Sequence, residues 1–323
     1  KFEAEMSLAP ETVPIPSDTQ TDVSAEKSVP FVATTSDNNP GSFDELHRKC
    51  REVFPMCFEG AKVMVQKGLS SHFQVSHTLS ISPLNTGYRF GATYVGTNML
   101  TPTDAFPVIL GDTDANGNTS ATFVHQWGKF RVKLQSQVQN SKLSAAQGTF
   151  EYRGRLSTLG LTVANIDVIS ESGIIVGQLL RRLTPKLDLG AELVYQYGKQ
   201  IPSGQISMLT YAARYNGKDF TASGTIGKSG LHLCYYHKQV DNLSFGVEFE
   251  SNFRSKEAST TFAYQAELPD EGVTMRASVD TNWTVTGVFE KKLSPSLPFT
   301  LALSGMLNHV KLQGRFGIGL IIG

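Results

Sequence analysis

The sequence contains no long hydrophobic run, and this absence is the first constraint on its fold class. A helix that crosses a bilayer needs about 20 consecutive, mainly apolar residues, and no stretch of the 323 residues approaches that length. A closed β-barrel is the other structure that satisfies every backbone polar group within lipid. Any membrane-spanning part of this chain is therefore expected to be a barrel.

An excess of charge of one sign is also missing. Lysine plus arginine number 29, and aspartate plus glutamate also number 29. The chain thus lacks the basic surplus that is typical of nucleic-acid binding. Charged residues form 18% of the chain, below the roughly 25% of an average globular domain. We expect no nucleic-acid partner.

Cysteine is scarce, and no secretory signal is recognisable. The three cysteines, Cys50, Cys57 and Cys234, are odd in number and have no metal-binding spacing, so we expect them to be reduced and structural. The amino end has no basic region followed by an apolar core, and its acidic residues argue against a mitochondrial presequence. A barrel protein without a secretory signal is expected in an organelle rather than in a bacterial outer membrane.

Signatures of enzymes are absent as well. The sequence has no glycine-rich phosphate loop, no zinc-type pairing of cysteine and histidine, and no Gly-x-Ser-x-Gly in a suitable context. Residues 112–117 partly match a calcium loop, but Phe123 stands where the loop needs glutamate. His232 and His237 lie on opposite faces of one predicted strand, so they cannot hold a metal together. We expect no enzyme activity, no cofactor and no metal.

The amino-terminal part divides into two segments. Residues 1–40 hold five prolines among serine, threonine and acidic residues, and such a segment cannot bury enough apolar surface to offset its ordering entropy. We expect it to be disordered. In residues 41–57 we expect an amphipathic helix over residues 42–54, because Ser42 and Glu45 form a capping box and Pro55 ends the periodicity. Its apolar face comprises Phe43, Leu46, Cys50, Val53 and Phe54.

Residues 58–323 alternate between apolar and polar residues in segments of about nine to eleven residues, the length of a tilted strand that crosses a bilayer. In residues 72–82, for example, Phe73, Val75 and Ile81 share one face. Aromatic residues lie near the ends of several segments, where membrane barrels place interfacial girdles. At about 14 residues per strand and turn, this region holds about 18 or 19 strands. The pattern predicts an all-β transmembrane barrel with a wide, wet lumen, and a large soluble β protein is the alternative.

Several passages together are similar to a known family. They are residues 43–55, 58–62, 67–77, 94–97, 105–108, 192–195, 235–238, 245–250 and 280–283. Over residues 40–323 the chain resembles the channel-forming subunits of the translocase of the outer mitochondrial membrane, which are related to the voltage-dependent anion channels. The resemblance implies a 19-stranded barrel whose first and last strands are parallel, with the amino-terminal helix inside the lumen. It also implies three kinds of protein partner: precursor proteins, single-span receptor and small subunits, and a second copy of the channel.

The functional signal in the sequence is charge on the polar face of the strands. Basic residues on this face include Arg89, Arg131, Lys133, Arg276, Lys311 and Arg315. Acidic residues on it are Glu192, Glu248, Glu250, Glu267, Asp280 and Glu290. Mitochondrial presequences are amphipathic and rich in arginine, so the acids would attract them through contacts worth about 1 kcal/mol each. The alternative is that these acidic residues have no specific role, because a water-filled lumen carries polar side chains in any case.

These residues suggest a protein-conducting channel for unfolded, presequence-bearing precursors. A metabolite or anion-conducting mitochondrial porin is the alternative, and it would need a mainly basic lumen.

The last predicted strand spans residues 311–323, and we expect it to close the barrel by parallel pairing with residues 61–66. Within it, Arg315, Gly317, Leu320 and Ile322 resemble the polar-x-Gly-x-x-hydrophobic-x-hydrophobic signal by which mitochondrial barrels are recognised for insertion. An ordinary final strand with the same spacing is the alternative.

Overall fold

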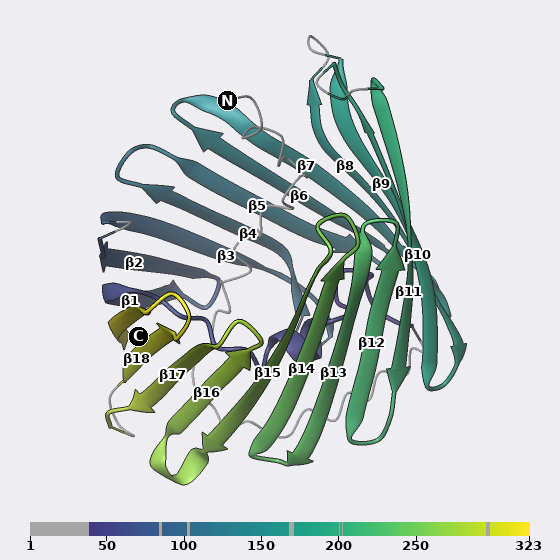
Figure 1. Ribbon diagram of the computed structural model, residues 1–323. Helices are drawn as coiled ribbons and strands as arrows, with labels where there is room; N and C mark the ends of the chain where they lie inside the picture. The colour runs from purple at the N-terminus through teal and green to yellow at the C-terminus, as the bar shows by residue number, and fades with distance from the viewer. Residues whose placement is uncertain are drawn as a thin grey trace, which may run out of the picture. The chain divides into compact units, whose positions relative to one another are not determined.

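The computed structural model describes residues 39–83, 86–101, 104–167, 171–199, 201, 203–294 and 298–323. Most of the segment predicted to be disordered, residues 1–40, therefore lies outside the described residues. Residues 60–322 form one 19-stranded sheet that closes on itself (Figure 1). This closed sheet confirms the predicted all-β barrel. No helix in the described part of the chain is long and apolar enough to cross a membrane.

The strands follow one another around the barrel in sequence order. Among the described residues, one short helix precedes them and one 3-10 turn lies between β15 and β16. The elements are α1 (Arg48–Arg51), β1 (Gly60–Ser70), β2 (Phe73–Ile81), β3 (Gly87–Thr101), β4 (Asp104–Asp114), β5 (Thr119–Trp127), β6 (Phe130–Gln139), β7 (Lys142–Arg153), β8 (Ser157–Asp167), β9 (Ser172–Thr184), β10 (Leu187–Tyr197), β11 (Gln205–Asn216), β12 (Phe220–Gly227), β13 (Gly230–Val240), β14 (Leu243–Asn252), β15 (Glu257–Leu268), η1 (Pro269–Glu271), β16 (Val273–Asp280), β17 (Thr284–Lys292), β18 (Phe299–Asn308) and β19 (Gln313–Ile322).

The barrel closes between its first and last strands. All consecutive strands are antiparallel, and an odd number of strands forces β1 and β19 to run in the same direction. Their parallel register runs from Gly60 opposite Gly317 to Val65 opposite Ile322. The predicted partner of the last strand, residues 61–66, is therefore confirmed.

The last strand begins later than predicted. Lys311 and Leu312 belong to the turn after β18, where the side-chain oxygen of Asn308 accepts the backbone N–H of Lys311 at 2.7 Å. Leu312 has a positive φ of 51° and its exposed fraction is 88%. The alternation extends through this turn by coincidence, because a turn residue has no fixed face.

One face of the sheet exposes large apolar side chains. In β10, the exposed fractions of Leu189 and Leu193 are 40% and 50%, whereas Asp188 on the opposite face is fully buried. In β19, Phe316 and Ile318 are exposed in the same way. Water does not favour an apolar surface of this extent, and it matches the lipid-facing band of membrane barrels.

The helix in the amino-terminal segment is much shorter than predicted. Only Arg48–Arg51 is α-helical, and the flanking residues between 42 and 54 mainly form turns with hydrogen bonds three residues apart. The capping box is only half made. Glu45 accepts the Ser42 N–H at 3.4 Å, but the Ser42 hydroxyl donates to Glu151 in β7 at 2.9 Å. The Ser42 hydroxyl, which would cap a longer helix, is thus bonded to the wall of the barrel instead.

Three residues of the predicted apolar face are nevertheless buried, together with the polar Ser42 and His47. Leu46, Cys50 and Val53 are no more than 3% exposed. Leu46 packs with Leu180 and Ala212, which belong to β9 and β11. Figure 1 shows α1, in purple, inside the ring of strands. The segment therefore packs against the face of the sheet opposite to the exposed apolar band.

Candidate functional site

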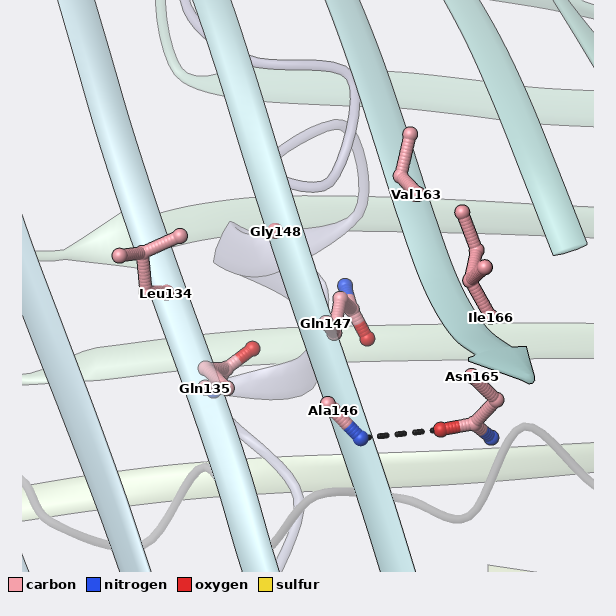
Figure 2. Close-up of a pocket in the computed structure, with 8 residues that line it drawn as sticks. All are labelled: Leu134, Gln135, Ala146, Gln147, Gly148, Val163, Asn165 and Ile166. Atoms are coloured by element: carbon pink, nitrogen blue, oxygen red, sulfur yellow. Dashed lines mark hydrogen bonds between the residues drawn. The ribbon is translucent and has the colours of Figure 1, made fainter. Parts of the chain in front are cut away.

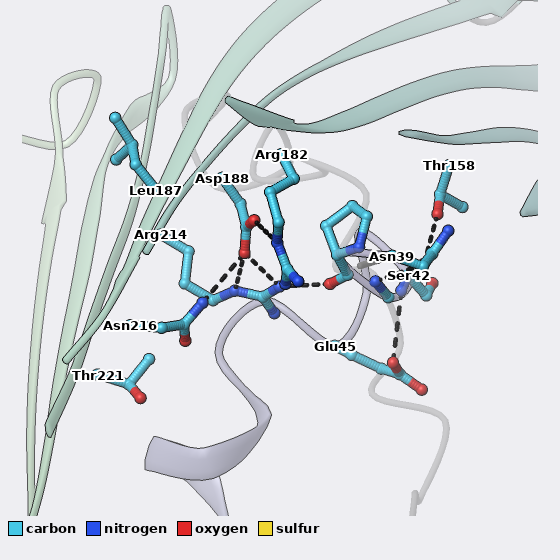
Figure 3. Close-up of polar contacts among 12 residues, drawn as sticks. Asn39, Ser42, Glu45, Thr158, Arg182, Leu187, Asp188, Arg214, Asn216 and Thr221 are labelled. Atoms are coloured by element: carbon cyan, nitrogen blue, oxygen red, sulfur yellow. Dashed lines mark hydrogen bonds and ion pairs between the residues drawn. The ribbon is translucent and has the colours of Figure 1, made fainter. Parts of the chain in front are cut away.

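A buried carboxylate organises the inner wall beside the amino-terminal segment. Asp188 in β10 is fully buried and accepts hydrogen bonds from Arg182 at 2.8 Å, from Arg214 at 2.7 Å and from Asn216 at 3.1 Å (Figure 3). The register places Arg182 and Arg214 directly opposite Asp188 on the two neighbouring strands. Two guanidinium groups share one carboxylate, and Arg214 also donates to the carbonyl of Pro40. This network ties the start of the described chain to the wall.

A second set of hydrogen bonds fixes the same segment to β7 and β8. The Asn39 amide donates to the Gly154 carbonyl at 2.6 Å, and its oxygen accepts the Thr158 hydroxyl at 3.2 Å. The Ser42 hydroxyl donates to Glu151, which is also paired with Arg153 at 3.1 Å. Residues 39–42 are therefore held by side chains from β7, β8 and β11.

The helical turn lies against β12, β13 and β14. The Cys50 thiol contacts the carbonyls of Tyr235 and Val247, each at 3.6 Å. Gly246 in β14 gives it room, because a Cβ there would lie 3.3 Å from both Cys50 and Phe54. Close approach of the two backbones thus depends on a glycine in the wall.

His47 is the buried polar residue of this contact. Its Nδ1 lies 2.8 Å from the Ser223 hydroxyl in β12, and its exposed fraction is 9%. Burial and the neighbouring His232 lower the pKa of His47 to about 4, so the ring is neutral at pH 7. Among the residues that the structure describes, its Nε2 has no hydrogen-bond partner. An unsatisfied buried polar atom costs about 1–3 kcal/mol.

Three of the predicted acidic residues lie near one level of the inner wall. Glu248 in β14 and Asp280 in β16 are both opposite Thr261 in β15, so the two acids share a face about 10 Å apart. Glu248 is 2.6 Å from His232 Nε2, and Glu250 is 3.7 Å from the same atom. Asp280 accepts the backbone N–H of Thr284 at 2.8 Å and so also stabilises the turn before β17.

The other acids lie elsewhere on the wall. Glu267 in β15 and Glu290 in β17 are both opposite Thr274 in β16. From the strand register, this pair lies about 20 Å along the strands from Glu248. Glu290 is 3.9 Å from Arg276, whereas Glu192 in β10 accepts a hydrogen bond from Gln178 at 2.8 Å. The acids therefore form two groups and one separate residue rather than one continuous track.

The residues of the predicted insertion signal lie at the seam between β1 and β19. Arg315 is 3.7 Å from Glu59, just before β1. A Cβ on Gly317 would lie 2.3 Å from the Phe58 carbonyl oxygen. The absence of a side chain at Gly317 thus allows the backbone of Phe58 to lie directly against β19 on the inner face. Leu320 and Ile322 share the face of the exposed Phe316, opposite to Gly317.

A shallow hollow of about 330 Å³ lies on β6, β7 and β8 (Figure 2). Within it, the side-chain oxygen of Asn165 accepts the Ala146 N–H at 3.0 Å. None of the residues lining this hollow is charged, so it does not fit ionic ligands. The lining residues are Leu134, Gln135, Ala146, Gln147, Gly148, Val163, Asn165 and Ile166.

Comparison with known proteins identifies the family. A family model described as eukaryotic porin matches residues 39–319.

The chain belongs to the eukaryotic porin family.

Relatives of this porin carry a more specific name. The chain is 70% identical over 293 residues to the mitochondrial import receptor subunit TOM40 homolog of Caenorhabditis briggsae, which covers 91% of this chain and 97% of that protein. It is 71% identical over 285 residues to the homolog of Caenorhabditis elegans, covering 88% of this chain and 95% of that protein. With the human homolog it shares 46% identity over 287 residues, covering 88% of this chain and 78% of that protein.

Proposed function

We propose that this porin is the protein-conducting channel through which unfolded, presequence-bearing precursors cross the mitochondrial outer membrane. The observation that carries the proposal is the closed 19-stranded barrel with a polar inner wall, in a chain 70% identical to a mitochondrial import receptor subunit. No catalytic step is proposed. The barrel provides a passive path, and its wall provides weak contacts.

The acidic residues of the inner wall are the proposed contacts for the basic face of a presequence. Glu250 and Glu267 are the most available, because both are exposed, whereas the side chains of Glu248 and Glu290 are only 21% and 35% exposed. Each contact is worth about 1 kcal/mol in water. Weak and separate sites suit transit, since a polypeptide must leave each site as readily as it enters.

Other surfaces suit the partners expected of such a channel. We propose that the exposed apolar band contacts lipid, single-span receptor and small subunits, and a second copy of the barrel. We also propose that the segment of residues 41–57 is a fixed lumen element, with Phe43, Leu46, Cys50, Val53 and Phe54 facing the wall. It would narrow the path without being a mobile plug, because its contacts with the wall involve β7, β9, β11–β14 and β18.

We propose that Arg315, Gly317, Leu320 and Ile322 also serve as the signal for membrane insertion. Leu320→Ala keeps the strand backbone and removes only an outward side chain. We expect this variant to refold in detergent like the wild type but to insert more slowly into isolated mitochondria, measured as protease-resistant barrel over time. Equal insertion rates would reject the signal at this position.

Recordings in planar bilayers test the proposed channel. We expect the purified barrel to give cation-preferring currents that a basic presequence peptide blocks. Anion preference without block would indicate a metabolite porin instead. A protein that refolds correctly but gives no current would reject both channel functions.

Charge reversal tests the acidic contacts. We expect the double variant Glu250→Lys and Glu267→Lys to need about 30-fold more presequence peptide for half block at low salt, because two contacts of about 1 kcal/mol each are lost. High salt should reduce this difference through screening. Glu271→Lys, in the exposed η1 turn, is the matched control. An unchanged block in the double variant would exclude these two residues as the contacts.

A further inference from the structure

Five potential metal ligands lie around His232, where the amino-terminal segment touches β13 and β14. They form two groups that share His232: one with His47 and Cys234, the other with Glu248 and Glu250. Nitrogen atoms of His47 and His232 and the sulfur of Cys234 all lie within 4.8 Å of one another. His232 Nε2 is 3.3 Å from the Cys234 sulfur and 2.6 Å from Glu248 Oε1. His232 and Cys234 are two residues apart in β13, so both side chains point to the inner face.

His47 supplies an independent indication of a ligand. The residue is 9% exposed, and its ring centroid lies 4.4 Å from that of His232. The Ser223 hydroxyl bonds Nδ1 at 2.8 Å, and within the described chain Nε2 has no partner. When Nδ1 donates to Ser223, Nε2 keeps a free lone pair. A hydrogen bond of this kind from the other ring nitrogen orients metal-binding histidines.

We infer that His47, His232, Cys234 and Glu248 bind a zinc ion that ties the amino-terminal segment to the inner wall. Two imidazoles, a thiolate and a carboxylate form a ligand set that suits tetrahedral zinc. Tetrahedral geometry places a nitrogen and a sulfur ligand about 3.5 Å apart, close to the 3.3 Å between His232 and Cys234. The Glu248 oxygen must move about 0.7 Å away from His232 to reach a ligand position.

The charges of the occupied site balance. The thiol of Cys234 gives its proton to water in the lumen, and the resulting thiolate and the Glu248 carboxylate together neutralise the divalent ion. His47 comes from the amino-terminal segment, and the other three ligands come from β13 and β14. The ion would therefore cross-link two parts of the chain that are about 190 residues apart in sequence. This role does not depend on what the channel conducts.

Cobalt and zinc titrations of the refolded, full-length barrel test this site. A non-thiol reductant is required, because it keeps Cys234 and the neighbouring Cys50 reduced without adding a competing thiolate ligand. We expect Co²⁺ to give the near-ultraviolet thiolate band and the intense visible bands of a tetrahedral site, and Zn²⁺ to displace it at one equivalent. Cys234→Ser should lose the thiolate band. His47→Ala should weaken Zn²⁺ binding at least about 100-fold.

Two matched variants separate this site from others. His237→Ala changes a histidine on the opposite face of the same strand, and Cys57→Ser changes a cysteine that contacts Gly305 instead. Both should bind as the wild type does. The inference is wrong if the wild type shows no cobalt–thiolate band, or if His47→Ala and Cys234→Ser, verified as folded by circular dichroism, bind zinc with unchanged affinity. If Cys50→Ser loses the cobalt–thiolate band and Cys234→Ser retains it, Cys50 is the sulfur ligand. That result would also overturn the proposed ligand set.

Discussion

Asp188→Ala is expected to destabilise the barrel more than any other single polar substitution on the inner wall. The carboxylate is fully buried and accepts bonds from Arg182, Arg214 and Asn216. Its removal leaves two guanidinium groups facing each other without an anion. Loss of one partner from a buried ion pair costs about 3–5 kcal/mol. Urea unfolding of the refolded barrel, followed by tryptophan fluorescence, measures the change in free energy.

The effect should depend on charge as well as on packing. Asp188→Asn retains an oxygen acceptor and should lose less stability than Asp188→Ala. Glu257→Ala, at the exposed start of β15, controls for the loss of a carboxylate as such and should change little. Equal unfolding midpoints for Asp188→Ala and the wild type would show that the network does not stabilise the fold.

Gly317→Val is the second substitution with a large expected effect, because it acts at the seam. Even a Cβ at this position would lie 2.3 Å from the Phe58 carbonyl oxygen and 2.7 Å from the Phe58 ring. The backbone that leads into β1 would have to move away from β19, which breaks the only parallel pairing in the described barrel. Overpacking costs about 1–3 kcal/mol, and loss of pairing adds to this. We expect little heat-modifiable, folded barrel after refolding in detergent.

Gly314→Val is the matched control within the same strand. A Cβ at Gly314 meets no atom closer than 3.6 Å, so this variant should refold with near wild-type yield. Similar yields for the two valine variants would show that contact with Phe58 is not what requires glycine at position 317.

The barrel was predictable from sequence because its signal is local. Each strand alternates in twos, as Phe73, Val75 and Ile81 do in β2, and the lipid face needs apolar residues at every second position. Closure was also predictable, since the apolar last strand required a partner and the family resemblance implied 19 strands with the first and last in parallel. Turns were less predictable. Leu312 continues the alternation although a side chain of Asn308 has already fixed a turn.

The details of the inner wall were not predictable, because they depend on pairing across strands. In the sequence Asp188 is one polar residue of an alternating strand, and only the strand register shows that Arg182 and Arg214 lie directly opposite it. The short helix could not be anticipated, since Glu151 takes the Ser42 hydroxyl from more than 100 residues away. The His47 cluster was missed for the same reason. The pair His232 and Cys234, two apart on one strand face, was the signal available.

Movement of a polypeptide through the barrel tests the proposed function most directly. A precursor with an amino-terminal presequence and a tightly folded carboxyl-terminal domain is added outside liposomes that contain the barrel and an enclosed protease. We predict that the presequence is cleaved inside, while the folded domain remains outside, only in liposomes that contain the barrel. An uncleaved presequence in liposomes whose barrels pass small ions would contradict a protein-conducting channel.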